Sequence, residues 1–402
     1  MHILLIHQAF AALDEPGGTR HHELARHLCR RGHQVTVIAS PVSYLTGTGQ
    51  GERIRVQTDD LGVTILRSYT LPVLHRSFIL RVFSFLSFMI SSFINGLFVR
   101  KVDLVWGTTP PIFQGPTAWL LARLKGVPFI LEVRDLWPAF AVAVGVLNHP
   151  FLIRLSEWLE RFLYRHADQV VVNSPGFIQH VHARGASHVA LVPNGADPEM
   201  FDPKAEGKHF RRKFGLEDRF VVLYAGAHGM SNDLDVVLAA AEQLCDDPSI
   251  QIVLLGSGKE KPRLRDEADQ RGIDNVIFLP PVPKIEMPNI LAGADACLAI
   301  LKPIELYKTT YPNKVFDYMA AGRPVLLAID GVIREVVEEA QAGVFIQPGD
   351  PAVLASVIRE MATNPEKCRT MGMNGRKIVE AQFSREKFAD KFSAILESIR
   401  RR

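Results

Sequence analysis

Lys314 and Asp317 stand three residues apart in the segment 311–325 and carry charges that are well placed for binding chemistry. A helix is predicted there, because Asn313 can cap its first N–H groups and Gly322 can take the left-handed position that ends it. A lysine in the first turn opposes the helix dipole, but it is favourable where a phosphate occupies the helix N-terminus. Asp317, one turn deeper, could then accept hydrogen bonds from a ribose. The alternative is an exposed Lys–Asp pair on a surface helix.

A second segment with phosphate-binding chemistry follows the apolar run 220–225, which is predicted to be a buried strand. Gly226, His228 and Gly229 come directly after this strand. A strand that ends in a glycine loop before a helix offers backbone N–H groups that can hold a phosphate.

Three charged residues, Glu132, Arg134 and Asp135, lie at the carboxyl end of the predicted strand 128–133. Side chains at this end of a parallel strand usually face the ligand crevice. They supply both signs of charge for holding a sugar hydroxyl and an anion. The alternative is that Asp135 caps a helix and the arginine is paired inside the protein.

The chain begins with a predicted strand–helix–strand unit, over residues 2–7, 23–31 and 34–39. Gly17 and Gly18 precede the helix some ten residues after the first strand, and there is no G-x-G-x-x-G. This spacing argues against a dinucleotide cofactor. The two glycines alone are also compatible with a plain flexible turn.

Composition suits a globular protein of two domains, with 402 residues, 47% hydrophobic and 22% charged. Four scattered cysteines without a CxxC indicate a reducing compartment and argue against structural zinc. Met1 and His2 lead directly into an apolar strand, so no signal peptide is expected. Residues 20–101 hold 11 Arg and Lys against 4 Asp and Glu, which indicates an anionic partner, either phosphates or an acidic membrane surface.

The run 82–99 contains no charged residue and would be roughly 27 Å long as a helix. It is not expected to span a bilayer, because the predicted strands on either side of it, 63–69 and 103–107, belong to one sheet. Many phenylalanines with cationic residues at both ends suit a helix that enters one leaflet of a membrane. A core helix wholly buried in the protein is the alternative.

Three motifs resemble those of a known family. The run Lys-Val-Phe-Asp-Tyr-Met-Ala-Ala-Gly-Arg-Pro-Val at 314–325 resembles the donor-site helix of the family 4 retaining glycosyltransferases. The Pro-Asn-Gly-Ala-Asp run at 193–197 is similar to the interdomain signature of that family. Arg-Asp-Leu-Trp-Pro at 134–138 resembles a bacterial branch that builds O-antigens and exopolysaccharides and includes N-acetylfucosamine transferases.

The resemblance implies the GT-B fold, an α/β architecture of two Rossmann-like domains facing across a cleft. Residues 1–203 would form the acceptor-binding domain, with a terminal helix of about 380–402 packing back on it, and residues 204–379 the nucleotide-sugar-binding domain. Many members grip the donor pyrophosphate with an Arg and a Lys where this chain has Ala227 and Asn232, which leaves His228 and Lys314 for that task. The expected catalytic residues are Lys314, Asp135, Arg134 and Glu132. The expected acceptor-binding residues are Gly17, Gly18 and Arg20. The expected donor-binding residues are Gly226, His228, Gly229, Gly258, Val282, Tyr311, Asn313, Lys314 and Asp317.

The predicted function is transfer of a sugar from a nucleotide-sugar donor to a polyprenyl-pyrophosphate-linked glycan at the inner face of the plasma membrane. A UDP-linked donor is expected, carrying an N-acetylated amino sugar such as N-acetylfucosamine. The resemblance implies retention of the anomeric configuration without a metal, and neither a cofactor nor a nucleic-acid partner is expected. Two alternatives stay open, a sugar-nucleotide 2-epimerase of the same architecture and a non-catalytic membrane-associated scaffold.

Overall fold

The computed structural model describes residues 1–43, 47, 49, 56–73, 78–203, 205 and 207–400. The chain divides into two compact units, Met1–Pro193 with Glu386–Arg402, and Asn194–Arg385. The boundary between the two units, after Pro193, lies ten residues before the boundary predicted at residue 203. The reason is that Phe201 packs in the core of the second unit and Asn194 bonds the carbonyl oxygen of Tyr311 there, at 2.7 Å.

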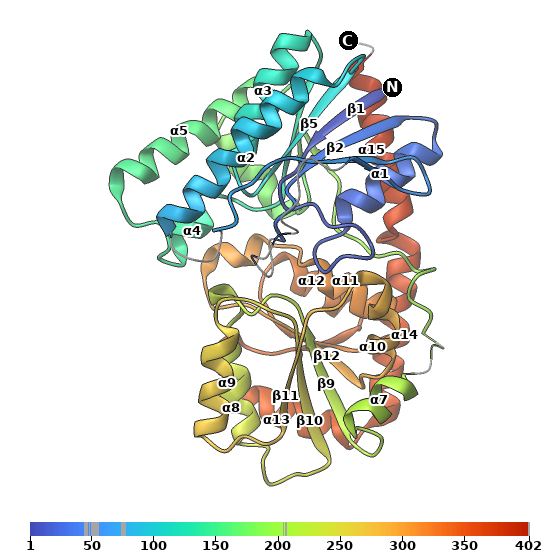
Figure 1. Ribbon diagram of the computed structural model, residues 1–402. Helices are drawn as coiled ribbons and strands as arrows, with labels where there is room; N and C mark the ends of the chain where they lie inside the picture. Colours follow the sequence, from blue (N-terminus) through green and yellow to red (C-terminus); the bar gives the residue numbers. More distant parts are fainter. Residues whose placement is uncertain are drawn as a thin grey trace. The chain divides into compact units, whose positions relative to one another are not determined.

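The N-terminal unit is built on an eight-stranded sheet of order β3-β4-β2-β1-β5-β6-β7-β8 (Figure 1). All neighbouring strands are parallel except β3 and β4. Runs of Val, Ile and Leu form the central strands because both sheet faces are covered. The strands are β1 (His2–Ile6), β2 (Gln34–Ala39), β3 (Val56–Thr58), β4 (Thr64–Arg67), β5 (Leu104–Thr109), β6 (Phe129–Val133), β7 (Gln169–Val172) and β8 (Val189–Leu191).

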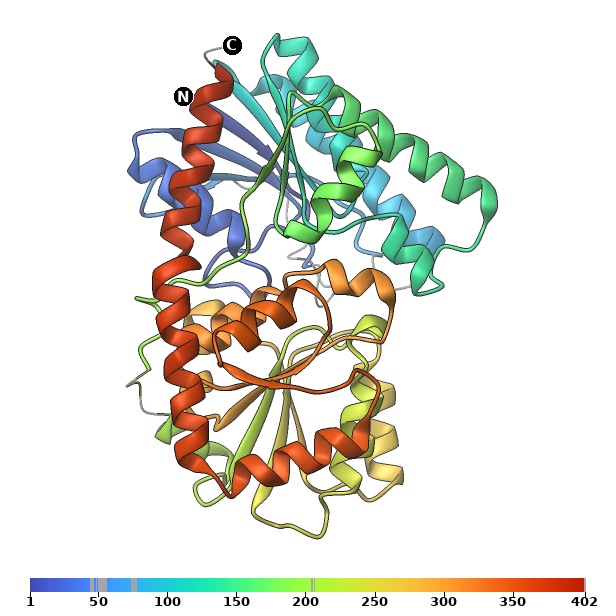
Figure 2. The same cartoon turned by 180° about the vertical axis from the view of Figure 1, so that it is seen from behind.

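Helices cover both faces of this sheet. One face packs on α1 (Arg20–Arg30) and α15 (Arg385–Arg400), the long C-terminal helix in Figure 2. Trp106 of β5 lies 4.6 Å from Phe392 of α15, ring centre to ring centre. The other face carries α2 (Phe78–Phe98), α3 (Gln114–Lys125) and α5 (Pro150–His166), while α4 (Ala139–Ala143) and α6 (Ile178–Ala183) are short.

Three glycines allow α2, α3 and α5 to pack closely against one another and against the sheet. A Cβ at Gly107 of β5 would lie 2.7 Å from the Cβ of Ala118, so α3 rests directly on the sheet. Gly96 and Gly115 likewise allow α2 to contact α3 and α3 to contact α5. The three helices therefore form one layer in the order α2, α3, α5.

The C-terminal unit has a six-stranded parallel sheet of order β11-β10-β9-β12-β13-β14. With the first sheet it confirms the predicted α/β fold class. Its strands are β9 (Phe220–Ala225), β10 (Ile250–Leu255), β11 (Val276–Leu279), β12 (Ala296–Ile300), β13 (Val325–Ala328) and β14 (Gly343–Phe345). Its helices are α7 (Lys208–Phe214), α8 (Leu234–Glu242), α9 (Lys261–Gln270), α10 (Met287–Ala292), α11 (Asn313–Ala320), α12 (Val332–Glu339), α13 (Pro351–Ala362) and α14 (Pro365–Gln382).

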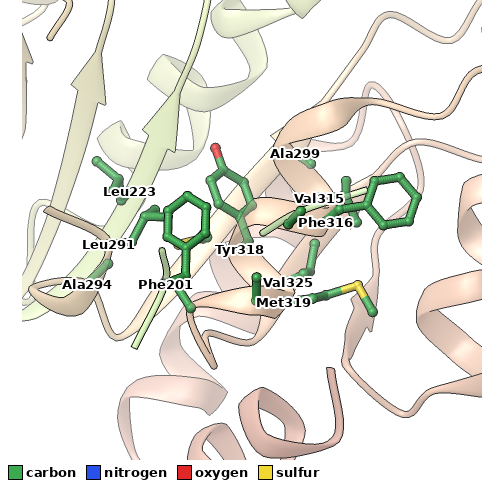
Figure 3. Packing of buried hydrophobic residues seen from close by; sticks show 14 of the residues in the cluster. Phe201, Leu223, Leu291, Ala294, Ala299, Val315, Phe316, Tyr318, Met319 and Val325 are labelled. Atoms are coloured by element: carbon green, nitrogen blue, oxygen red, sulfur yellow. The ribbon is translucent and has the colours of Figure 1, made fainter. Parts of the chain in front are cut away.

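Helix α11 is fixed against this sheet by its buried face. Val315, Tyr318 and Met319 belong to the same apolar cluster as Leu223 of β9 (Figure 3). The Tyr318 hydroxyl also accepts a hydrogen bond from the N–H of Ala225, at 2.9 Å. This packing holds the first turn of α11 at the carboxyl end of β9.

Candidate active site

Glycines bring the loops after β9 and β10 into backbone contact. A Cβ at Gly256 would lie 1.8 Å from the carbonyl oxygen of Gly226, and one at Gly258 would lie 2.3 Å from that of His228. A Cβ at Gly226 would lie 2.5 Å from the Lys314 ammonium nitrogen, whereas Gly229 has room for one. Gly256 and Gly258 are therefore required by close approach to backbone atoms, and with Gly226 they form a cradle at the carboxyl ends of two neighbouring strands.

His228 lies in this cradle with its ring fully buried. Its backbone N–H donates to Ser257 O at 2.8 Å, but neither ring nitrogen has a hydrogen-bond partner. Burial lowers the pKa of His228 to about 4, and the charges of Lys261 and Lys314 act in the same direction. The imidazole is neutral at physiological pH, so one of its nitrogens can donate a hydrogen bond to a phosphate oxygen.

Lys314, in the first turn of α11, lies with its ammonium 3.8 Å from the ring centre of Tyr224. Among the described residues it has no hydrogen-bonded or ion-paired partner, and α11 has no side-chain cap. Burial lowers the pKa of Lys314 to about 7. An unpaired ammonium beside an unpaired imidazole, at the end of a glycine cradle, is suited to binding an anion.

Asp317 does not pair with Lys314, so the alternative of a surface Lys–Asp pair is wrong. Its Oδ2 atom pairs with Lys284, which follows the turn after β11 and also lies 5.0 Å from the ring centre of Phe201. The Oδ1 atom of Asp317 is buried without a partner and can accept a hydrogen bond from a ligand hydroxyl. Sequence reasoning missed Lys284, because the residues are 33 positions apart and only the fold brings them together.

The remaining predicted donor-site residues have mainly packing contacts. Asn313 does not cap α11 as predicted, because Pro312 holds the cap position and Asn313 Oδ1 accepts from Arg385 at 3.0 Å. The Tyr311 ring packs on Phe316, with 5.6 Å between ring centres, and Val282 packs against the same core. Direct contacts of these side chains with a donor stay predictions.

In the N-terminal unit, Glu132 is fully buried in β6 and paired from both sides. Its Oε1 atom accepts from Arg20 Nε at 2.9 Å, and its Oε2 atom lies 2.8 Å from His21 Nε2. Arg20 also donates to the carbonyl oxygens of Pro193 and Val192. Burial raises the pKa of Glu132, but His21 and Arg20 outweigh it and leave that pKa well below its usual range. Because both side chains are occupied by bonds inside the domain, Arg20 and Glu132 hold neighbouring segments in place. This does not favour the predicted contacts of Arg20 with the acceptor and of Glu132 with the reacting sugar.

A set of buried polar atoms without partners lies at the carboxyl ends of the N-terminal strands, and we call it the polar cluster. Its members are His7 after β1, His21 of α1, Thr109 at the end of β5, Asp135 after β6 and Asn173 after β7. Sequence reasoning found only Asp135. The unpaired atoms after strand ends match the donors and acceptors that a hydroxyl-rich ligand requires.

Within the polar cluster, the rings of His7 and His21 lie 4.2 Å apart between centres. Burial lowers the pKa of both, to about 4 for His21, so both are neutral near pH 7. Burial raises the pKa of Asp135 to about 7, although Arg134 opposes the shift. Asp135 does not cap a helix, since Pro138 holds the cap position of α4. Arg134 is bonded to the carbonyl oxygens at 109 and 110.

The glycine pair before α1 is exposed and lies in the loop between β1 and α1. Gly17 has a φ of 153°, and a Cβ there would lie 2.7 Å from the Cβ of Ala11, whereas Gly18 has open space. Two residues earlier, Glu15 pairs with Arg67 through both oxygens. The described residues contain no group of three or more His, Cys, Asp or Glu side chains arranged to hold a metal ion.

Two α/β domains, each built on a mainly parallel sheet and together similar in fold to solved glycosyltransferase structures, place the protein in the GT-B fold class. Residues 17–195 match the family described as "Glycosyl transferase 4-like domain", and residues 207–378 match "Glycosyl transferases group 1". The chain therefore belongs to the two-domain glycosyltransferases that combine these families.

Relatives and solved structures agree with this assignment. The chain is 27% identical over 313 residues to WcaI of Escherichia coli (strain K12), a glycosyl transferase named for colanic acid biosynthesis, covering 75% of this chain and 76% of the relative. It is 26% identical to a D-inositol 3-phosphate glycosyltransferase of Streptomyces avermitilis over 310 residues, 72% of this chain and 65% of the relative. In fold it is similar to sucrose-phosphate synthase from Thermosynechococcus elongatus (TM-score 0.80, 19% identity, covering 99% and 98% of the chains). It is also similar to Anabaena HepE in complex with UDP and glucose (TM-score 0.74, 16% identity, covering 99% and 100%).

Proposed function

We propose that this glycosyltransferase takes its sugar from a UDP-linked donor whose diphosphate binds at Lys314, His228 and the glycine cradle. The observation that carries the proposal is the unpaired Lys314 ammonium beside the unpaired His228 ring. The free Oδ1 atom of Asp317 would accept from the ribose. The complex of HepE with UDP supports a nucleotide of this kind.

The chemistry requires stabilisation of a diphosphate as it leaves the sugar carbon. Negative charge grows on the leaving oxygens, and a fixed cation there is worth several kcal/mol in sites of this kind. Lys314 would supply the charge and His228 a hydrogen bond, with no metal needed in the proposed mechanism. Retention of the anomeric configuration belongs to the same proposal, and proton NMR of the product's anomeric linkage would test it.

The polar cluster of the N-terminal unit would bind the acceptor. His7 and His21 would bond acceptor hydroxyls, and Asp135, with a pKa raised to about 7 by burial, would accept the proton of the attacking hydroxyl. The name of WcaI supports a surface-polysaccharide role, and we extend it to a polyprenyl-pyrophosphate-linked acceptor and an N-acetylated donor sugar such as N-acetylfucosamine.

A screen of nucleotide sugars against lipid-linked glycan acceptors, with detection of released nucleotide, tests this function. We expect UDP release that requires an acceptor and falls strongly in Lys314→Met, while Lys377→Met, on the exposed side of α14, keeps full activity. Conversion of the sugar nucleotide without an acceptor would instead identify a 2-epimerase. Absence of UDP binding in calorimetry would indicate a non-catalytic scaffold.

A further inference from the structure

Helix α2 turns its polar side chains toward the protein. Ser84 Oγ donates to the carbonyl oxygen of residue 71 at 2.8 Å, and Ser91 Oγ donates to that of residue 69 at 2.6 Å. Asn95 Nδ2 donates to Ser68 Oγ at 2.7 Å. These polar side chains of α2 are therefore hydrogen-bonded within the domain and do not face outward.

The outward face of α2 is apolar. Phe83, Ile90, Ile94 and Leu97 follow one another at helical spacing and are exposed by 55%, 59%, 48% and 43%. Surface helices of soluble proteins have the opposite arrangement, with the apolar stripe toward the core. On α2 large apolar side chains face outward, while Ser84 and Ser92 are buried beside Phe88 on the inner face.

Helix α5 buries a charged side chain and likewise exposes large apolar ones. Glu160 is fully buried, 2.8 Å from His180 Nε2 and 2.7 Å from Arg184 Nη1. On the outer side Phe151, Leu155 and Trp158 are exposed by 65%, 48% and 59%.

The two apolar faces belong to one helical layer. Helix α3 lies between α2 and α5 and exposes Leu120 and Leu124 (Figure 1). Most of the exposed large apolar side chains of the described residues lie on these three helices. We call this surface the docking face; it comprises Phe83, Ile90, Ile94, Leu97, Leu120, Leu124, Phe151, Leu155 and Trp158.

The docking face carries positive charge on α3 and α5. Arg123, Arg154 and Arg165 are exposed and have no ion-pair partner among the described residues. The acids on the same helices are neutralised, since Glu160 is buried in its pairs and Glu157 faces Arg161 at 3.6 Å. A second copy of the chain would meet like charge on this face, whereas an anionic lipid surface has the complementary charge.

Helix α2 is long and apolar enough to cross a membrane by length and composition alone. Its position in the fold excludes this, because β4 before it and β5 after it belong to one sheet. Its polar face is also bonded to the domain. A helix that lies flat on the membrane satisfies both observations.

We propose that the docking face of α2, α3 and α5 inserts into one leaflet of an anionic phospholipid bilayer, with α5 contributing as much as α2. This deepens the proposed function, because a lipid-linked acceptor would be reached from that surface, but it rests on geometry that does not involve the donor site.

Vesicle flotation of the full-length protein tests the proposal. We expect it to float with phosphatidylcholine vesicles that contain phosphatidylglycerol, and less with phosphatidylcholine alone. Ile90→Ser/Ile94→Ser/Leu97→Ser and Phe151→Ser/Leu155→Ser/Trp158→Ser should each lower the partition coefficient by at least about tenfold. Arg154→Gln and Arg165→Gln should each lower it about fivefold, and less at high salt.

The matched control is Val353→Ser/Met373→Ser, in the C-terminal unit, where the side chains are exposed by 39% and 42%. It should float like the unchanged protein. All substituted side chains are exposed, so thermal melts should show unchanged folding. Quenching of Trp158 by brominated lipid, absent in Trp158→Phe, would place α5 in the leaflet.

Three results would overturn the proposal. If the protein does not float with anionic vesicles but still binds UDP, the membrane proposal is wrong and the donor-site proposal is unaffected. Flotation that the α5 variant does not weaken would remove α5 from the docking face. If the protein does not bind vesicles but self-associates in light scattering, and the variants abolish this self-association, the docking face binds a second copy of the chain.

Discussion

At the scale of single residues, Lys314 carries a charge that the fold penalises. Burial holds its pKa at about 7, far below the ordinary 10.5. The unfolded chain therefore binds more protons between these values, so this residue's penalty on stability is full below pH 7 and is relieved as the pH rises toward 10.5. We expect Lys314→Met to raise the melting temperature below pH 7 and to abolish UDP binding. A variant that loses both stability and binding would contradict the role of Lys314 as an anion-binding cation.

The same depressed pKa makes nucleotide binding dependent on pH. A bound diphosphate favours the ammonium form, so UDP binding above pH 7 should take up a proton at Lys314. Affinity should then fall as the pH rises. Calorimetry in buffers of different ionisation enthalpy measures this uptake, and its persistence in Lys314→Met would assign the proton to another group.

One carboxylate oxygen of Asp317 pairs with Lys284, the other is proposed to bind the ribose, and a double variant separates these two tasks. Asp317→Ala should weaken UDP binding by about 1.5–3 kcal/mol through the lost ribose contact. It should also destabilise the fold, because Lys284 loses its partner in a buried position. Adding Lys284→Met should restore the melting temperature without restoring affinity. Recovery of both would show that Asp317 acts only through stability.

At the scale of elements, the glycine cradle depends on loops that approach within contact distance. Gly258→Ala places a Cβ 2.3 Å from His228 O, so the loop after β9 must move and UDP affinity should fall by at least about tenfold. Gly229→Ala is the comparison variant: it keeps the backbone N–H that is expected to face the donor, and its Cβ would meet Asn232 at an ordinary 3.5 Å, so it should lose less affinity than Gly258→Ala. Equal affinities of both variants in calorimetry would show that the cradle does not position the diphosphate.

Local patterns predicted most elements but not the partners that the fold supplies. Apolar runs such as 220–225 predicted the strands, and Gly322 takes the left-handed conformation expected after α11. The pairing of Asp317 with Lys284 could not be predicted, because it joins segments far apart in the sequence. The sequence likewise shows that 82–99 has no charged residue, but it does not show which face of the helix is buried. That is decided by packing against α3. Glu132 illustrates a further limit, since a carboxylate at a strand end looks the same in sequence whether it meets a ligand or an internal arginine.

At the scale of the whole molecule, two units with separate sheets and cores divide the proposed work. The nucleotide would bind only in Asn194–Arg385, and the membrane would contact only the unit that contains α2 and α5. Each ligand should therefore protect its own unit, by an amount that follows its free concentration relative to its dissociation constant.

Hydrogen-exchange mass spectrometry of the full chain measures this division directly. UDP should slow exchange in the loops after β9 and β10 and in the first turn of α11, and Lys314→Met should abolish the effect. Anionic vesicles should slow exchange in α2 and α5, and Phe151→Ser/Leu155→Ser/Trp158→Ser should weaken it while leaving the UDP response unchanged. Protection of α5 by UDP alone would show instead that the two sites are coupled through the fold, since ligand-linked stabilisation would then reach a surface that the nucleotide does not touch.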